Sequence, residues 1–444
     1  MRSHTLLARL LALFGAGFTT ATFAVGFALP EQGVVATGYA FAGVSANPED
    51  ASTIFFNPAG MSFLREREAS MAMHAIDVTA RFSNAGSLSP AGPAFPLAGG
   101  DGGNPIGLNW VPNFYMAAPG PRLSFGLGVG APFGLKTEYP GDSMGRYQAL
   151  SSDVKTLNIN PSLAYRVGAG SIGFGVNFQY MRAELGNALD FGAACFGSAF
   201  GPAACAAGGV VPQGSDGRIT VEGDSWGFGA NVGWMLPLAD GSYVGVSYRT
   251  PIRHKLSGEG RFSLPAFSPP YSALTAAIVD SGAKVDITMP GMFSVSARAQ
   301  LTPRLAILGD VTHTEWSRFD ELRIRFESGA QDAVIPAHWK NTIRTSIGIA
   351  YDASPALRLR GGVTYEPSTV PDRYRTARVP DNDQTLVAMG FGFRLSPTAR
   401  IDMAYGRVFV KDAPIDNTIA GSGTLRGEYR LHANILSVQY RVAF

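Results

Sequence analysis

Apolar and polar residues alternate along many segments of this chain, and these segments recur from one end of it to the other. Between residues 157 and 167 the odd positions are mainly Leu, Ile, Tyr and Val, while Asn, Ser and Arg occupy most even ones. The same period of two returns over residues 172–180, 293–301, 357–365 and 387–395. The pattern predicts β-strands with one apolar face and one polar or glycine-rich face.

The repetition favours a membrane-spanning barrel over a soluble sandwich. Strands of a barrel in lipid turn an apolar face outward and a polar face toward the lumen. A sandwich also alternates, but its strands are usually shorter and its apolar faces pack inward. Composition agrees with lipid as part of the solvent, because 46% of the residues are hydrophobic and only 16% are charged.

Two kinds of connection separate the predicted strands. Short breaks such as residues 167–170, 302–303 and 396–397 contrast with longer stretches at residues 84–109, 188–217 and 258–282. Outer-membrane barrels have short turns at the periplasmic rim and long loops outside. Counting strands between the breaks predicts an antiparallel barrel of about fourteen strands, with both chain ends at the periplasmic rim.

The last strand indicates how the barrel closes. Apolar residues occupy every second position from Leu436 to Phe444, where the chain ends. An unpaired apolar edge would promote aggregation, so we expect this strand to pair with the first one. The sequence therefore predicts an all-β transmembrane barrel in the outer membrane of a bacterium.

The N-terminus has the layout of an export signal. Arg2 and Arg9 precede an apolar run over residues 10–18, and small residues follow it up to Ala24. This layout predicts a signal peptide over residues 1–24, cleaved after Ala24. The run is too short for a spanning helix, which needs about 20 residues.

Residues 25–64 differ from the predicted strands. They are rich in small residues and show no sustained alternation before the first strand, which we expect near Glu66. A barrel of about fourteen strands leaves a hole in its middle. We therefore expect residues 25–64 to fold back as a plug in the lumen, and residues 65–444 to form the barrel.

The two cysteines, Cys195 and Cys205, both lie in the long stretch 188–217. In an oxidising compartment such a pair is expected to form a disulfide. Closing so short a loop is worth roughly 2–3 kcal/mol in the chain-entropy model. The expected role is to hold an external loop.

Several function classes find no support. A net charge of +2 argues against a nucleic-acid partner. The six histidines sit in no nucleophile motif, and no metal-ligand spacing, P-loop or dinucleotide fingerprint is present. We expect no enzyme activity, no cofactor and no bound metal. A general porin is disfavoured because porins lack such an N-terminal segment.

Short motifs spread along the chain resemble one family. They are Gly26-Phe27-Ala28-Leu29, Asn57-Pro58-Ala59, Pro132-Phe133-Gly134-Leu135 with Thr137-Glu138, Asn160-Pro161-Ser162-Leu163-Ala164-Tyr165 and Trp316-Ser317-Arg318-Phe319. Together they resemble the FadL-type outer-membrane transporters of long-chain fatty acids and other hydrophobic compounds. The resemblance runs over essentially the whole mature chain.

The resemblance implies that ligand is captured outside and then held in the lumen. The apolar stretch from Phe262 to Val279 is the candidate capture loop, although it could instead simply pack against its neighbours. Its candidate ligand contacts are Phe262, Leu264, Phe267, Tyr271 and Leu274. Inside the barrel, Gly26 and Phe27 are expected to touch the ligand, whose burial is worth about 0.8 kcal/mol per methylene.

The resemblance also implies a sideways exit and a gating role for the plug. Pro132, Phe133 and Gly134 lie where the third strand should kink, and proline with glycine should interrupt its pairing. A plain strand end is the alternative. Asn57, with Pro58 and Ala59, is expected to hydrogen-bond the plug backbone and to take part in gating.

The cargo stays open between two classes. Fatty-acid carriers of this kind use basic groups for the carboxylate, but no motif transfers such positions to this chain. Arg182 and Lys340 are candidates near strand ends, although the alternation places Arg182 on the lipid side. We expect a monomer, surrounded by outer-membrane lipid, that transports long-chain fatty acids; uncharged aromatic hydrocarbons are the alternative.

Overall fold

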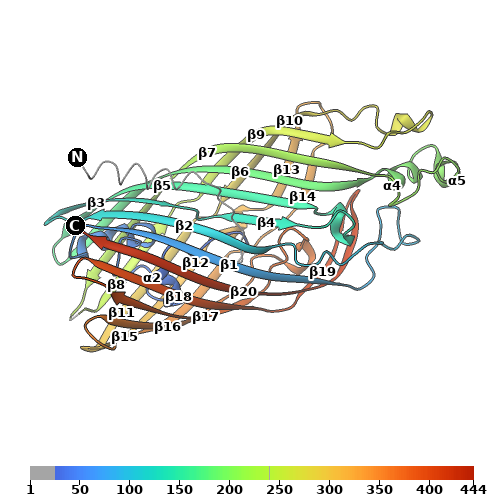
Figure 1. Ribbon diagram of the computed structural model, residues 1–444. Helices are drawn as coiled ribbons and strands as arrows, with labels where there is room; N and C mark the ends of the chain where they lie inside the picture. The colour runs from blue at the N-terminus through green and yellow to red at the C-terminus, as the bar shows by residue number, and fades with distance from the viewer. Residues whose placement is uncertain (1–25, 240) are drawn as a thin grey trace.

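The computed structural model describes residues 26–239 and 241–444. These residues form a long antiparallel barrel with a folded N-terminal segment inside it (Figure 1). The predicted signal peptide, residues 1–24, lies outside the described residues. Within the described ranges, no helix combines the length and apolar character that crossing a bilayer requires.

The wall is built from antiparallel strands, and β20 closes the barrel by pairing with the whole length of β1. The strands are β1 (Glu68–Asn84), β2 (Gly107–Ala118), β3 (Leu123–Gly130), β4 (Gly134–Glu138), β5 (Ser151–Val167), β6 (Gly170–Asp190), β7 (Asp216–Pro237), β8 (Tyr243–Arg249), β9 (Ile252–Ser263), β10 (Ser281–Met289), β11 (Met292–Thr302), β12 (Leu305–Thr314), β13 (Glu321–Phe326), β14 (Ala333–Pro336), β15 (Thr342–Asp352), β16 (Leu357–Glu366), β17 (Gln384–Arg394), β18 (Ala399–Val410), β19 (Ala413–Ile419) and β20 (Gly423–Ala443).

Six of the wall strands are interrupted and therefore count as two elements each. The pairs are β3 with β4, β8 with β9, β10 with β11, β12 with β13, β14 with β15, and β18 with β19. Joining the pairs gives a wall of fourteen strands, which confirms the number predicted from the alternation. An even number puts both ends of the wall at one rim, which we call the terminal rim; the opposite end is the loop rim.

The alternation separates two environments. Asn158 and Asn160 of β5 are buried and face the lumen, whereas Leu163 and Tyr165 of the same strand are exposed on the outside. Outward residues of neighbouring strands continue this apolar surface, as Trp226 and Phe228 do at 52% and 64% exposure. An apolar surface of this extent on the outside of a barrel requires lipid around it.

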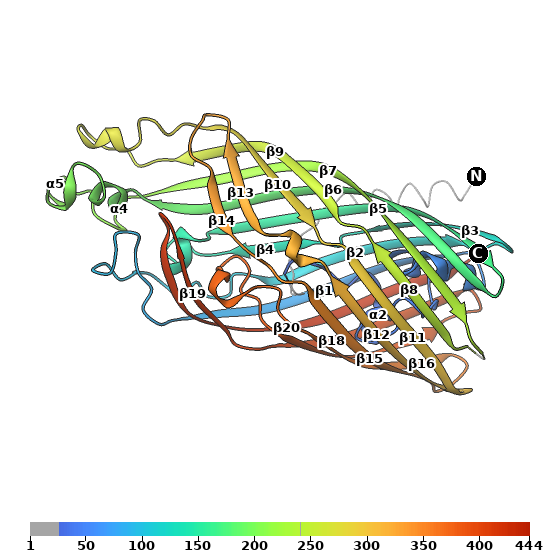
Figure 2. The same ribbon diagram turned by 180° about the vertical axis from the view of Figure 1, so that it is seen from behind.

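The connections differ between the two rims. Turns at the terminal rim are tight, and Gly168 takes a φ of +58° between β5 and β6. Long segments project from the loop rim, including α4 (Phe191–Phe196), α5 (Gly201–Ala207) and η3 (Tyr271–Leu274) (Figure 2). Cys195 and Cys205 form a disulfide between α4 and α5.

The N-terminal segment, residues 26–64, lies inside the barrel near the terminal rim (Figure 1). We call it the hatch. Its helices are α2 (Val34–Gly38), α3 (Thr53–Phe56) and η1 (Pro58–Phe63). Helix α2 packs against β16, β17, β18 and β20, and η1 packs against β3, β5, β6 and β7.

Lumen-facing glycines let the hatch reach the wall. A Cβ at Gly233 of β7 would lie 1.9 Å from Oδ1 of Asn57, and one at Gly362 of β16 would lie 2.1 Å from the carbonyl oxygen of Tyr39. Any side chain there would displace the hatch, because packed interiors have no such spare room. The glycine face of the strands is therefore the seat of the hatch.

Candidate functional site

An apolar cavity lies between the hatch and the loop rim, and we call it the outer cavity. It encloses about 1010 Å³ of empty space, counted with its opening. Phe27 of the hatch lines it, together with wall residues from the strand halves nearest the loop rim. Apolar wall residues that line it are Leu135, Val154, Met181, Leu185, Val221, Leu256, Val285, Ile287, Leu322 and Ile335.

Aromatic rings close the side of this cavity that faces the terminal rim. Phe27 contacts Trp316 edge-on at 5.0 Å between ring centroids, and Trp316 contacts Trp339 at the same distance. Phe319 and Phe133 complete the layer around Phe27. We call these five residues the aromatic partition; it makes one end of the cavity apolar and rigid.

Gly26 is part of the same arrangement. Its φ is +71°, and a Cβ on it would lie 2.7 Å from the ring of Trp339. Glycine is the residue that adopts this conformation without strain and leaves room for the ring. The predicted ligand contacts Gly26 and Phe27 therefore lie against the partition, and Phe27 lines the cavity itself.

One buried arginine, Arg378, also lines the outer cavity. It is 6% exposed, and its Nη1 donates to the carbonyl of Ser151 (2.7 Å) and to Oγ of Ser152 (2.8 Å). Among the described residues no carboxylate lies within ion-pair distance of Arg378, and its Nε has no hydrogen-bond partner. Burial lowers the pKa of Arg378 to about 10, so it stays cationic at neutral pH.

The segment that carries Arg378, residues 367–383, is tied into the barrel. The Tyr139 hydroxyl donates to the carbonyl of Ala377 (2.7 Å) and lies 3.2 Å from the hydroxyl of Tyr429. Asn417 donates from its amide to the carbonyl of Arg375 (2.9 Å). These bonds hold the guanidinium of Arg378 at the cavity rather than in solvent.

The structure places the two basic candidates from the sequence elsewhere. Arg182 points outward, as its parity predicts, and forms an ion pair with Glu222 at 3.0 Å. Lys340 is exposed between β14 and β15. Neither lines the outer cavity, so both fail as partners of a carboxylate held there. Arg378 was missed because a single arginine in a polar stretch carries no local pattern.

The third wall strand is interrupted at residues 131–133, between β3 and β4. Strand β2 pairs with β3 only over Phe114–Ala118, and the ladder of β4 runs along β5. The hatch lies along the break: the Leu29 N–H donates to the carbonyl of Pro132 (2.8 Å), and the Gly134 N–H donates to the carbonyl of Phe27 (3.0 Å). The N-terminal residues thus cover the place where the neighbouring ladder is interrupted.

Asn57 connects the hatch to itself and to the wall. Its Nδ2 donates to the carbonyls of Ser45 (2.7 Å) and Trp234 (3.0 Å), and its Oδ1 accepts from the Ala59 N–H (3.1 Å). Asn57 is fully buried. Its role in holding the plug backbone was expected; the bond to β7 was not.

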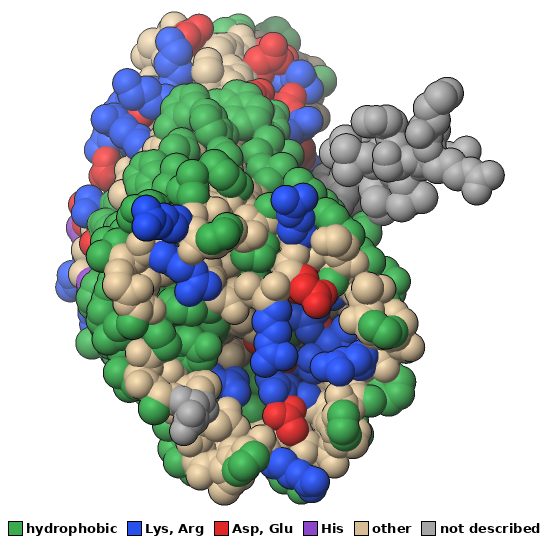
Figure 3. Space-filling view, turned by 90° about the vertical axis from the view of Figure 1, so that its left-hand side faces the viewer, with side chains coloured by type: hydrophobic (Ala, Val, Ile, Leu, Met, Phe, Trp, Pro, Cys, Tyr) green, Lys and Arg blue, Asp and Glu red, His purple; other side chains and the backbone are tan. Residues whose placement is uncertain are grey.

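An ionic cluster joins the hatch to the wall near the terminal rim. Glu49 of the hatch contacts Arg360 and Arg358 of β16, and Arg360 also pairs with Asp402 of β18 at 2.8 Å. Figure 3 looks onto this rim and shows Lys and Arg side chains gathered around the mouth of the barrel. Glu49 lies more than 300 residues before its arginine partners, so the sequence alone does not predict these pairs.

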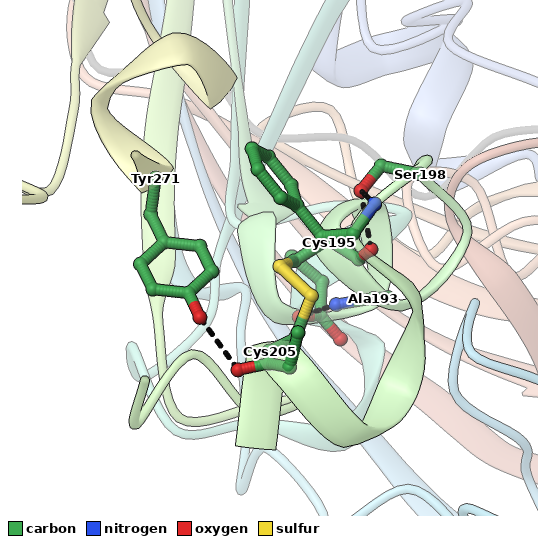
Figure 4. Close-up of a disulfide and its surroundings, with 8 residues drawn as sticks. Ala193, Cys195, Ser198, Cys205 and Tyr271 are labelled. Carbon is green, nitrogen blue, oxygen red and sulfur yellow. Dashed lines mark hydrogen bonds between the residues drawn. A yellow bond between two sulfur atoms is a disulfide. The ribbon is translucent and has the colours of Figure 1, made fainter. Parts of the chain in front are cut away.

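The predicted capture loop packs against the disulfide-bonded loop. Phe267, Tyr271 and Leu274 surround the Cys195–Cys205 pair, and the Tyr271 hydroxyl donates to the carbonyl of Ala204 (2.6 Å) (Figure 4). The loop is shorter than predicted, because β9 extends to Ser263. The placement of Phe262 in the loop is therefore wrong: it lies in β9, opposite Ile219.

None of the five residues predicted in the capture loop lines the outer cavity. Leu264 is half-buried beyond the end of β9. The aromatic and aliphatic side chains of the two loops instead form a small apolar cluster at the far end of the loop rim. Any contact of this cluster with ligand would precede entry into the barrel.

The sequence similarity of this chain to known proteins extends over both the hatch and the wall. A sequence model of the family described as "Outer membrane protein transport protein (OMPP1/FadL/TodX)" matches residues 15–444. A "Long-chain fatty acid transport protein" of Salmonella typhi is 28% identical over 403 residues, covering 88% of this chain and 89% of that protein. "Outer membrane protein P1" of Haemophilus influenzae is 25% identical over 476 residues, covering 100% and 99%.

Solved structures share the fold. The crystal structure of a Pseudomonas aeruginosa FadL homologue superimposes with a TM-score of 0.84 at 24% identity, covering 94% of this chain and all of that one. The Pseudomonas putida toluene transporter TodX superimposes with a TM-score of 0.71 at 18% identity, covering 93% and 98%. At these identities the likeness concerns the fold alone.

Proposed function

Since the chain belongs to the OMPP1/FadL/TodX family of outer membrane transport proteins, we propose that its cargo is a long-chain fatty acid. The family match confirms the resemblance inferred from the motifs. It makes the chain a bacterial outer-membrane transporter of hydrophobic compounds and not an enzyme. The identity of the compound is the proposal.

The observation that carries the proposal is the pairing of an apolar cavity with Arg378. The apolar lining suits an alkyl chain, each methylene of which gains about 0.8 kcal/mol on burial. A buried cation without a carboxylate partner is costly for the protein, and a ligand carboxylate would compensate for it. An uncharged hydrocarbon would leave that cost in place, so the site favours a fatty acid.

We place the steps of transport along the barrel axis. The apolar cluster of the two long loops would capture the acid, and the outer cavity would then hold it with its carboxylate on Arg378. Release would follow a shift of the N-terminal residues away from the break at Pro132, Phe133 and Gly134, which would open the wall toward lipid. The backbone bonds from Phe27 and Leu29 to that break support this coupling.

Uncharged aromatic hydrocarbons are the second candidate cargo. Phe27, Phe319 and Trp339 line one end of the outer cavity, and ring faces and edges of this kind also suit a small aromatic compound. The rest of the lining is almost entirely apolar. What counts against this candidate is the position of Arg378. In either case we propose that the monomer is the working unit, because hatch, cavity and break all belong to one chain.

Uptake measurements separate the two candidates. A host that lacks its own transporter of this type would express the chain and receive labelled oleate or labelled toluene. We expect oleate uptake that falls about tenfold in Arg378→Met, because a hydrogen-bonded charge contributes roughly 1.5–3 kcal/mol. Arg378→Lys should retain part of it, and Arg182→Met, an exposed arginine, should retain all.

Two outcomes would contradict the proposal. Toluene uptake without oleate uptake would assign the chain to hydrocarbon transport. Equal oleate uptake by wild type and Arg378→Met, at equal amounts of folded barrel in the membrane, would remove Arg378 from ligand binding. Heat-modifiable migration on gels would report the amount of folded barrel.

A further inference from the structure

A second cavity lies on the other side of the aromatic partition, between the hatch and the wall. We call it the inner cavity. It encloses about 710 Å³, counted with its opening, and Trp316 separates it from the outer cavity. Its lining is mixed, with Phe55, Phe56 and Met292 providing apolar surface, and Ser247 and Asn231 providing polar groups.

Arg249, the last residue of β8, also lines the inner cavity and is only 7% exposed. Its Nη2 donates to the carbonyl of Phe55 (2.9 Å), its Nη1 donates to Oδ1 of Asn177, and its guanidinium lies 4.2 Å from the centroid of the Phe55 ring. All of these partners are neutral. Within residues 26–239 and 241–444, no carboxylate lies within ion-pair distance of Arg249.

Two other buried arginines of the lumen have carboxylate partners. Arg360 pairs with Glu49 and Asp402, and Arg441 lies within 4.0 Å of carboxylate oxygens of Glu68 and Asp402. A buried cation that lacks such a partner costs stability unless an anion joins it. Arg249 therefore resembles Arg378 in being buried without a carboxylate partner, and it too borders open space.

The acidic side chain that lines the inner cavity is remote from Arg249 along the wall. Glu366 belongs to β16, and β11, β12 and β15 stand between that strand and β8. The other basic lining residue, Arg344, belongs to β15, so β11 and β12 stand between its strand and β8; the rest of the lining is neutral and includes the rings of Phe55 and Phe56. A small anion with an apolar tail matches this end of the cavity.

We propose that the inner cavity is a second ligand site, which takes the carboxylate of an aliphatic acid on Arg249 and its first methylenes against Phe55, Phe56 and Met292. The site lies across Trp316 from the outer cavity, and two of its lining residues, Ala28 and Leu29, pair with Phe133 and Pro132 at the break in the third strand. It goes beyond the proposed function, because it does not require that the outer cavity bind long-chain acids.

Crystals of the full mature chain grown with 6-bromohexanoate would test the site directly. We expect an anomalous bromine peak between Phe55 and Met292, with carboxylate density on the guanidinium of Arg249. Bromine confined to the outer cavity, or no peak at saturating ligand, would overturn the proposal. The measurement uses the unaltered protein, so it does not depend on whether a variant folds.

Calorimetric titration with hexanoate would measure the contribution of the charge. Arg249→Met should lower the affinity of the inner cavity for hexanoate at least tenfold. Arg249→Lys should lower it less, and Arg182→Met should leave it unchanged. Unchanged binding in a folded Arg249→Met barrel would refute the role of Arg249. A bromine peak in the inner cavity together with no oleate uptake would reject the proposed cargo and keep this site. Oleate uptake without a bromine peak in the inner cavity would reject this site and keep the proposed cargo.

Discussion

At the scale of single residues, Asn57 shows how one side chain can hold a hatch in a barrel. It bonds to two carbonyls, one in the hatch and one in β7, and Gly233 provides the space that it occupies. The Ser45 acceptor is buried, so no water replaces a lost amide there cheaply. The residue is therefore better suited to fixing the position of the hatch than to forming the barrel.

Asn57→Ala should reduce ligand uptake several-fold while leaving barrel assembly intact. The reason is the loss of two hydrogen bonds from the Asn57 amide; the bond to Ser45 is buried, and a bond of this kind is worth roughly 1 kcal/mol or more when its acceptor is left unsatisfied. Uptake per folded barrel is the measurement. The matched control is Asn434→Ala, because Asn434 lies on the outer face of β20 with Tyr405. Unchanged uptake in Asn57→Ala would exclude a gating role.

Asp381 is a residue whose charge should depend on pH near neutrality. It belongs to the segment 367–383, and burial raises the pKa of Asp381 to about 7, although the Ser368 hydroxyl and the Gly26 N–H favour its ionised form. A carboxyl with a raised folded-state pKa binds its proton more tightly in the folded state. Its protonation therefore favours folding below the unfolded-state pKa, near 4, and this contribution is lost as pH rises toward 7.

We therefore expect the thermal stability of the wild type to decrease between about pH 4 and pH 7 by more than that of Asp381→Asn. Unfolding temperatures measured in detergent across this range would show the difference. Parallel curves for the two proteins would mean that Asp381 does not keep its proton in the folded state.

At the scale of elements, the third wall strand owes its break to one extra residue. Gly130 lies opposite Asn158 of β5 and Gly134 lies opposite Lys155, so residues 131–133 stand against only two residues of β5. Such an extra residue interrupts the ladder and bends the strand. The hatch backbone uses this irregularity, since Pro132 accepts a bond from Leu29.

Deleting Pro132 should join β3 and β4 into one regular strand. The deletion leaves two residues opposite two, which restores the register with β5. We expect the barrel to assemble and ligand uptake to be lost, because the proposed exit would close. Pro132→Ala keeps the extra residue and should keep most of the uptake. Full uptake after the deletion would show that cargo leaves elsewhere.

At the scale of the whole molecule, a fourteen-stranded wall needs the hatch to seal it, because a barrel of this width is otherwise open to water. Shape alone does not hold the hatch. The contacts of Glu49 with Arg358 and Arg360 bind it to the wall by charge near the terminal rim, and glycine faces of the strands give it a close fit.

Glu49→Gln should loosen the seal. Removing this carboxylate leaves Arg360 with Asp402 as its buried partner and removes the ionic tie between hatch and wall, and breaking a buried pair is costly. In planar bilayers we expect ion-conducting openings at least several-fold more frequent than in the wild type. Glu259→Gln, which alters an exposed pair with Arg261, should leave the conductance unchanged. If the Glu49→Gln barrel opened no more often than the wild type, packing alone would be sufficient to seal the lumen.

The sequence by itself determined the features that depend on local periodicity. The period of two predicted the strands and their faces, the Gly and Pro breaks predicted fourteen of them, and the apolar alternation ending at Phe444 predicted closure. The position of the break at Pro132 also followed from local chemistry, since proline and glycine interrupt a ladder wherever they occur. The cysteine pair could be matched because only two cysteines are present.

Tertiary structure alone decided which distant residues meet. Arg378 and Arg249 are buried beside cavities and lack a carboxylate partner, and whether a partner is present depends on every segment that folds around the charge. Glu49 and Arg360 stand 311 positions apart, and no local pattern pairs them. Burial and charge compensation are properties of the folded lumen, whereas alternation is a property of each strand, and this is why the sequence predicted the barrel but not the residues that line its cavities.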